Sequence, residues 1–102
     1  MHVKAAKLKL RLPTTESLKD KRCILKSLLA RTKQEHHIAI SEVGLMDNIR
    51  EAVLGLALVC NDARLNESIL SKVISAIEKH PEIEIETEQI EEIRNMCCEL
   101  IE

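Results

Sequence analysis

Basic side chains gather between residues 19 and 33, and they are the groups in this chain best suited to chemistry. Lysine and arginine bind phosphate through charge and hydrogen bonds, and the first turn of a helix adds partial positive charge beside them. Backbone-directed RNA binding requires no more than this. The alternative is a solvated basic face on which Asp20 already interacts with the helix dipole. The predicted anion-binding or RNA-binding residues are Lys19, Lys21, Arg22, Lys26 and Lys33.

No other group of residues resembles a catalytic or metal site. The sequence has no phosphate-binding glycine loop, and no nucleophile and base stand at a recognisable spacing. Zinc ligands are usually paired roughly two to four residues apart, whereas Cys23 and Cys60 are isolated and Cys97 and Cys98 are adjacent. We therefore expect free thiols in a reducing compartment. The prediction is a protein that is not an enzyme and has no catalytic residues, no metal and no cofactor.

Three further sets of polar residues have simple structural explanations. Glu42 shares its strand face with Ile38 and Ile40, and an inward carboxylate could be a catalytic acid or base. A position at a strand end, or a bulge that turns Glu42 outward, is favoured instead. The pair at 36–37, two histidines, is expected to be exposed. The glutamates between residues 82 and 92 could bind a hard cation, but a solvated edge strand is favoured because its charges discourage aggregation.

Composition limits the ways in which RNA could be bound. The 102 residues include no Phe, Tyr or Trp, so none of these rings can stack on a base. The net charge is −2, yet residues 1–37 hold ten Lys and Arg against three acids, and residues 38–102 hold five against fourteen. This asymmetry indicates either a surface for nucleic acid or for an acidic partner, or two halves that neutralise each other in the fold.

The sequence favours a cytoplasmic protein without membrane contact. No apolar run approaches the roughly 20 residues that a membrane-spanning helix needs. The first residues alternate Lys with Leu and lack the apolar run of a signal peptide.

Hydrophobic spacing predicts the elements that position these groups. Strands are expected at about 3–12, 37–43, 52–60 and 82–86, because apolar residues there alternate or, in 52–60, occupy both faces. Helices are expected to begin at Ser17, which forms a capping box with Asp20, and at Asn61-Asp62, with a third helix from Thr87. On the first helix, Lys21 points toward the core side, and its ammonium is expected to reach the edge of the layer.

The order β-α-β-β-α-β predicts a ferredoxin-like α+β domain. Its four-stranded antiparallel sheet should have the order 4-1-3-2, with two helices on one face. The domain would span residues 1–86. Residues 87–102 would form a C-terminal amphipathic helix, packed on the domain or at a dimer interface.

This topology decides which basic residues are neutralised. Because the first and fourth strands are neighbours, the basic residues of the first strand should face Glu84 and Glu86 and form ion pairs with them. The stripe on the first helix has no comparable acidic partner. The first-strand residues concerned are Lys7, Lys9 and Arg11.

The third strand carries a face of small residues on the side of the sheet away from the helices. If it were left open, such an apolar patch would mark an interface. Either the C-terminal helix covers it or a second subunit does, so a homodimer is possible. The residues of this small-residue face are Val53, Gly55, Ala57 and Val59.

Several spaced motifs resemble the bacterial YlxP-like family, a domain of unknown function. The resemblance covers about residues 3–86, and departs from the family at Ile49, where an aromatic residue is often found, and in the 87–102 tail. The matching stretches are Ser17-Leu18-Lys19-Asp20-Lys21-Arg22, Lys26-Ser27-Leu28, Ser41-Glu42-Val43, Ala52-Val53-Leu54-Gly55, Asn61-Asp62-Ala63-Arg64 and His80-Pro81-Glu82.

The resemblance implies a ferredoxin-like fold, in agreement with the pattern above. Genes of this family tend to lie among those for translation initiation and ribosome maturation, which implies contact with RNA or a ribosomal subunit. The function predicted is thus a non-catalytic accessory factor that contacts RNA or the ribosome through its first helix. The alternative is a protein-interaction or small-ligand module that self-associates through its sheet face.

Overall fold

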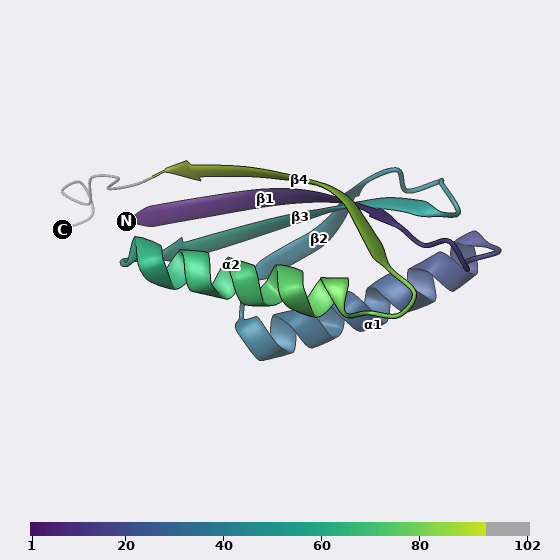
Figure 1. Cartoon of the computed structure of the whole chain (residues 1–102), viewed down its shortest axis with the longest axis horizontal. Coiled ribbons are helices and arrows are strands. Elements are labelled where there is room, and N and C mark those ends of the chain that lie inside the picture. The colour runs from purple at the N-terminus through teal and green to yellow at the C-terminus, as the bar shows by residue number, and fades with distance from the viewer. Residues whose placement is uncertain (94–102) are drawn as a thin grey trace.

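The computed structural model describes residues 1–93, in which a sheet is covered on one face by two helices (Figure 1). The sheet is antiparallel and its strand order is β2-β3-β1-β4. This is the predicted ferredoxin-like arrangement. The elements in chain order are β1 (His2–Arg11), α1 (Leu18–His36), β2 (Ala39–Gly44), β3 (Glu51–Cys60), α2 (Ala63–Glu78) and β4 (Glu84–Ile93).

β1 is one of the two central strands, with β3 on one side and β4 on the other. It pairs with β3 from His2↔Cys60 to Arg11↔Glu51, and with β4 from Val3↔Ile93 to Arg11↔Glu84. Even-numbered residues of β1 face the helices and are buried from Lys4 onward, whereas its odd-numbered residues lie on the other face of the sheet.

The hydrophobic cluster between sheet and helices is built from aliphatic side chains only. Alternate residues of β1 and β3 meet the inner faces of α1 and α2 there. The most deeply buried apolar side chains are Leu8, Leu10, Leu12, Ala52, Leu54, Val73 and Ile77.

α1 begins at the predicted capping residue. The Ser17 Oγ accepts a hydrogen bond from the Asp20 amide at 3.1 Å, while the Asp20 carboxylate accepts from the Glu16 amide at 3.2 Å, not from Ser17 as expected. The helix ends at His37, whose left-handed backbone (φ 52°) lets its amide donate to the Lys33 carbonyl. These caps fix where the basic residues of α1 stand.

The predicted C-terminal helix is wrong for residues 87–93, which continue β4. A bulge in β4 opposite Lys9 and Leu10 shifts the alternation, so Ile85 and Ile90 both lie on the helix side of the sheet although they are five residues apart. The helix is predicted from Thr87 as a cap and from the helical spacing of Ile90, Ile93 and Cys97, and the bulge does not follow from that pattern. The rest of the predicted helix, residues 94–102, lies outside the described residues.

Neither α1 nor α2 could cross a membrane. Within the described part of the chain, neither helix is both long and apolar enough to do so.

Candidate anion-binding site on the first helix

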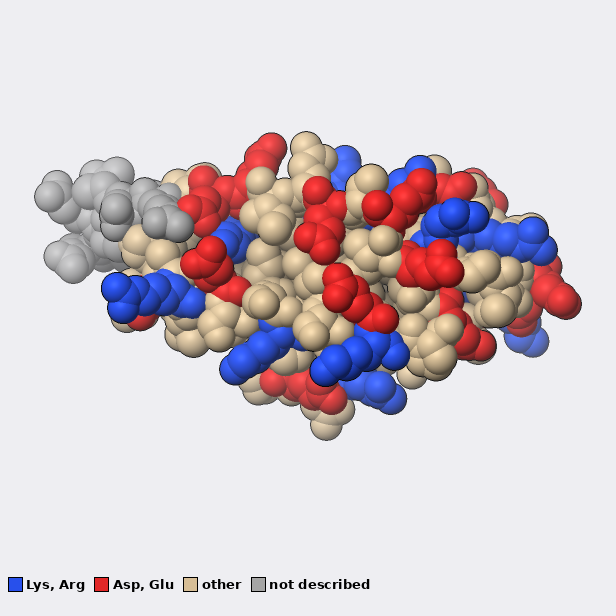
Figure 2. All heavy atoms as spheres, viewed as in Figure 1, with Lys and Arg blue, Asp and Glu red and all other residues tan. Residues whose placement is uncertain are grey.

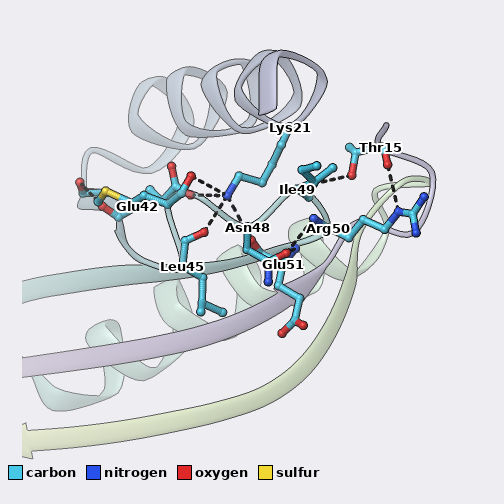
Figure 3. A network of polar contacts seen from close by, with 10 residues as sticks. Thr15, Lys21, Glu42, Leu45, Asn48, Ile49, Arg50 and Glu51 are labelled. Carbon is cyan, nitrogen blue, oxygen red and sulfur yellow. Dashed lines mark hydrogen bonds and ion pairs between the residues drawn. The ribbon is translucent and has the colours of Figure 1, made fainter. Parts of the chain in front are cut away.

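Lys21, which belongs to the predicted anion-binding set, is fully buried instead (Figure 3). Its Nζ donates hydrogen bonds to the carbonyls of Leu45 at 2.9 Å, Met46 at 3.3 Å and Glu51 at 3.1 Å. The same Nζ lies 3.1 Å from the Glu42 Oε2. Lys21 therefore cannot contact RNA in this fold, and the prediction that it does is wrong.

Lys21 and Glu42 form a polar link between α1 and the end of β2. A buried charge is tolerated when it is both paired and hydrogen-bonded, and Lys21 has a carboxylate and three carbonyl partners. Glu42 lies near the end of β2, as favoured from the sequence, but no bulge turns it outward: it points inward with its alternation, and its side chain is 19% exposed. This contact could have been predicted from the sequence, because the spacing puts both Lys21 and Glu42 on inward faces.

The β2–β3 connection is held from its other side as well (Figure 3). The Thr15 hydroxyl donates to the Ile49 carbonyl at 2.7 Å, and the Arg50 Nε donates to the Thr15 carbonyl at 3.2 Å. The Asn48 Oδ1 accepts from the amides of Arg50 and Glu51, each at 2.9 Å. The connection is thus fixed against the start of α1.

The remaining four predicted residues form an exposed basic stripe along one flank of α1. None of them takes part in an ion pair among the described residues, whereas Lys4 pairs with Glu92 at 3.2 Å and Lys21 with Glu42. Their charges are therefore available to an anion from outside. The basic stripe consists of Lys19, Arg22, Lys26 and Lys33.

A groove lies between this stripe and β2. Its volume is about 460 Å³, and its lining combines cations with an aliphatic floor and the Glu42 side chain. Such a groove can hold phosphate or carboxylate groups against the cations while apolar stems rest on the floor. Its lining residues are Arg22, Leu25, Lys26, Leu29, Ala30, Lys33 and Glu42.

The predicted neutralisation of β1 is confirmed for Lys9. Its Nζ lies 3.2 Å from the Glu51 carboxylate and 3.6 Å from that of Glu86. The hydrogen bond and charge of Glu51, followed by the charge of Glu86, raise the pKa of Lys9 above its ordinary value. Arg11 faces Glu84 in the register and Lys7 faces a glutamine, but neither forms an ion pair among the described residues.

Charge is distributed unevenly over the surface. In the view of Figure 2, acidic side chains lie along the upper part of the molecule, where β4 runs, and several basic side chains gather in the lower part, over the helices. This pattern does not simply repeat the division along the sequence, because α2 carries Arg64 and Lys72 although it belongs to the acidic half.

The small-residue face predicted on β3 is open to solvent. Val59 is 66% exposed, Ala57 is exposed, and Val53 and Gly55 are partly buried. Val43 from β2 packs over Gly55, where an added Cβ would meet the Val43 Cγ1 at 3.0 Å. Residues 87–93 do not cover this face, because they form β4 within the sheet. The part of the expectation that used these residues as a cover is therefore wrong.

The open face is hollowed beside β2. The hollow has a volume of about 610 Å³. Its apolar lining includes Ala5, Ala39, Val43, Gly55 and Ala57, and Lys7, Lys33, Gln89 and Glu91 lie among its polar lining residues.

The two histidines singled out in the sequence do not belong to a metal-binding cluster among the described residues. His36 lies in the last turn of α1, with its Nε2 3.8 Å from the Glu35 carboxylate, and His37 caps the helix. In the described residues, no three His, Cys, Asp or Glu side chains come close enough together to hold a metal ion.

Comparison with known proteins supports the resemblance found in the sequence. A family model described as "Protein of unknown function (DUF503)" matches residues 3–90. Over 68 residues the chain is 37% identical to the uncharacterized protein YlxP of Bacillus subtilis (strain 168), a match that covers 67% of this chain and 74% of that protein. The predicted family relationship is thereby confirmed.

Proposed function

The chain belongs to the DUF503 family of proteins of unknown function, and we propose that it is a non-catalytic factor that contacts RNA or the ribosome through α1. The observation that carries this proposal is the basic stripe. Four cations stand along one flank of a helix, exposed, and form no ion pair among the described residues.

The contrast with the other lysines supports the proposal. Three other lysines are each within 3.2 Å of a glutamate carboxylate: Lys4, Lys9 and Lys21. Their positive charges are therefore neutralised by ion pairs within the molecule. A stripe left unneutralised beside a groove is what a phosphate backbone requires. The family's genomic neighbourhood, among translation genes, is in keeping with an RNA partner.

The contact would be directed to the RNA backbone. Phosphate contacts position a protein on a nucleic acid but carry no sequence information. Since the chain has no Phe, Tyr or Trp, stacking on such rings cannot add base preference. Binding should therefore be weakly sequence-specific and strongly dependent on salt.

The test is a salt titration of binding to a single-stranded RNA and to isolated ribosomal subunits. If all four cations neutralise phosphates, the logarithm of the affinity should fall with the logarithm of salt with a slope of about −3. The triple variant Lys19→Glu, Arg22→Glu, Lys26→Glu should lose binding, whereas Arg31→Glu, on the opposite side of α1, should keep most of it. Equal binding by the triple variant and the native protein would refute the proposal.

A second candidate function, self-association through the small-residue face, is favoured by the open apolar hollow. Lys7 and Glu91 border the hollow without an ion pair among the described residues, and a second copy could supply their partners. Sedimentation should then show a dimer that Ala57→Glu converts to a monomer. A native protein that is monomeric at every concentration would exclude this function, and self-association should be less sensitive to salt than RNA binding.

A further inference from the structure

β2 is an edge strand whose outer side is unpaired among the described residues. The backbone N–H and C=O groups on such an edge can accept an additional strand from another polypeptide. The register of β2 shifts between Glu42 and Gly44, which leaves Val43 as a bulge. The regular part of the edge is therefore short, spanning residues 39–42.

Hollows lie on both faces of the sheet beside this edge. On the helix side is the groove that contains Arg22, Lys26 and Lys33. On the open side is the larger hollow, which is lined by Ala39 and other small residues. Lys33 lines both, so the two hollows meet at the edge of β2.

A strand added beside β2 would fill both hollows at once. Successive side chains of a strand point to opposite faces, so one alternate set would enter the basic groove and the other would lie over the small residues of the open face. Acidic side chains suit the first set and small or aliphatic side chains the second. We propose that the edge of β2 binds an extended acidic segment of a partner protein by strand addition, with its carboxylates on Arg22, Lys26 and Lys33.

Charge argues against a second copy of this chain as the occupant. Pairing β2 with β2 would place two basic stripes side by side, which like charges oppose. A second copy that presented its acidic β4 would be complementary in charge, but a head-to-tail contact of this kind need not close and can link molecules into chains. An acidic segment from a different protein can bind the same cations without like-charge repulsion and without linking copies of this chain together.

This inference goes beyond the proposed contact with RNA because it uses the backbone of β2, which phosphate binding does not need. An acidic segment and RNA would nevertheless compete for Lys26 and its neighbours. The two proposals can be separated, since only strand addition depends on the amides of the ligand.

The experiment uses a fluorescent eight-residue peptide that alternates glutamate with valine, titrated with the full chain at low salt. Two further peptides carry N-methyl groups, one on the glutamates and one on the valines. In a strand, only one of these sets directs its amides toward β2, so one N-methylated peptide should lose binding and the other should keep it. Backbone amide signals of residues 39–42 should shift when the unmodified peptide binds.

Matched variants test the cations. Lys26→Glu should weaken peptide binding about tenfold, because close charge pairs at an interface are lost and replaced by repulsion. Arg31→Glu changes the net charge equally but lies about half a turn away around α1, so its effect should stay below about twofold. A peptide with lysine in place of glutamate should not bind.

Three results would overturn the inference. Equal binding of the parent peptide and both N-methylated peptides would mean simple charge attraction without strand addition. In the second result, the protein alone shows a solution mass that increases with its concentration and returns to that of a monomer when the peptide is added. That result would show that another copy of the chain occupies the edge of β2. RNA binding that is sensitive to Lys26→Glu, with no peptide binding at all, would leave the proposed function standing and remove this one.

Discussion

Lys21 and Lys26 lie five residues apart on the same helix, yet one is buried and paired and the other is exposed and unpaired among the described residues. Lys21 is 0% exposed and makes four polar contacts through its ammonium. Lys26 is exposed and has no ion pair among the described residues. Five residues turn a helix through about 140°, which carries the side chain from the core side to the outer flank.

The difference teaches that the role of a lysine depends on what stands opposite its position. An inward lysine is stable here because Glu42 and three carbonyls were placed to meet it. An outward lysine costs the fold little and remains free for a ligand. One motif of six residues, Ser17–Arg22, therefore supplies both the buried Lys21 contact and part of the proposed binding surface.

The largest expected effect on stability tests the polar link formed by Lys21 and Glu42. Lys21→Met should lower the free energy of unfolding by about 3 kcal/mol, because it leaves the Glu42 carboxylate and three carbonyls without their partner. The midpoint of thermal unfolding, followed by far-ultraviolet circular dichroism, should fall by about 15 °C. Lys26→Met is the matched control and should stay within about 0.5 kcal/mol of the native protein. Similar losses in the two variants would break the comparison.

A smaller effect should follow from removing the opposing charge. Glu42→Gln keeps an oxygen near the Lys21 ammonium but leaves a buried cation without an anion, so we expect a loss of about 1.5 kcal/mol in urea unfolding. Glu67→Gln, at an exposed position of α2, should have almost no effect. If Glu42→Gln were as stable as the native protein, the three carbonyls alone would suffice to hold Lys21.

The smallest effect concerns Lys9, a surface lysine that is paired with acids. Its pKa is raised above 10.5 by Glu51 and Glu86, so the stabilisation from these contacts is complete below pH 10.5 and is lost as pH rises through the raised pKa. Glu51→Gln should bring the Lys9 pKa back toward 10.5, as read from an NMR titration of its side chain. The stability curves of Glu51→Gln and the native protein should converge at high pH, and a constant gap between them would assign the effect of Glu51 to something other than Lys9.

The strand and helix order could be predicted because β1, β3 and both helices have regular hydrophobic spacing. The direction of Lys21 could be predicted too, but its partners could not, since the conformation of the β2–β3 connection does not follow from any local spacing. β4 is predicted too short because Ile90 and Ile93 also fit helical spacing, and because the bulge that places Ile85 and Ile90 on one face does not follow from any local pattern. The basic stripe was visible from the sequence, whereas the groove beside it depends on how α1 packs against β2.

The central position of β1 has a consequence for how the protein folds while it is being synthesised. Its two neighbours, β3 and β4, come from residues 51–60 and 84–93, and Val3 finds its partner Ile93 ninety residues later. A chain emerging from the ribosome can assemble β1, α1, β2 and β3, with the contact between Lys21 and Glu42 among them, while β1 still lacks its second neighbour. During that interval one side of the middle strand is an exposed edge, and the sheet is completed by nearly the last segment that the structure describes.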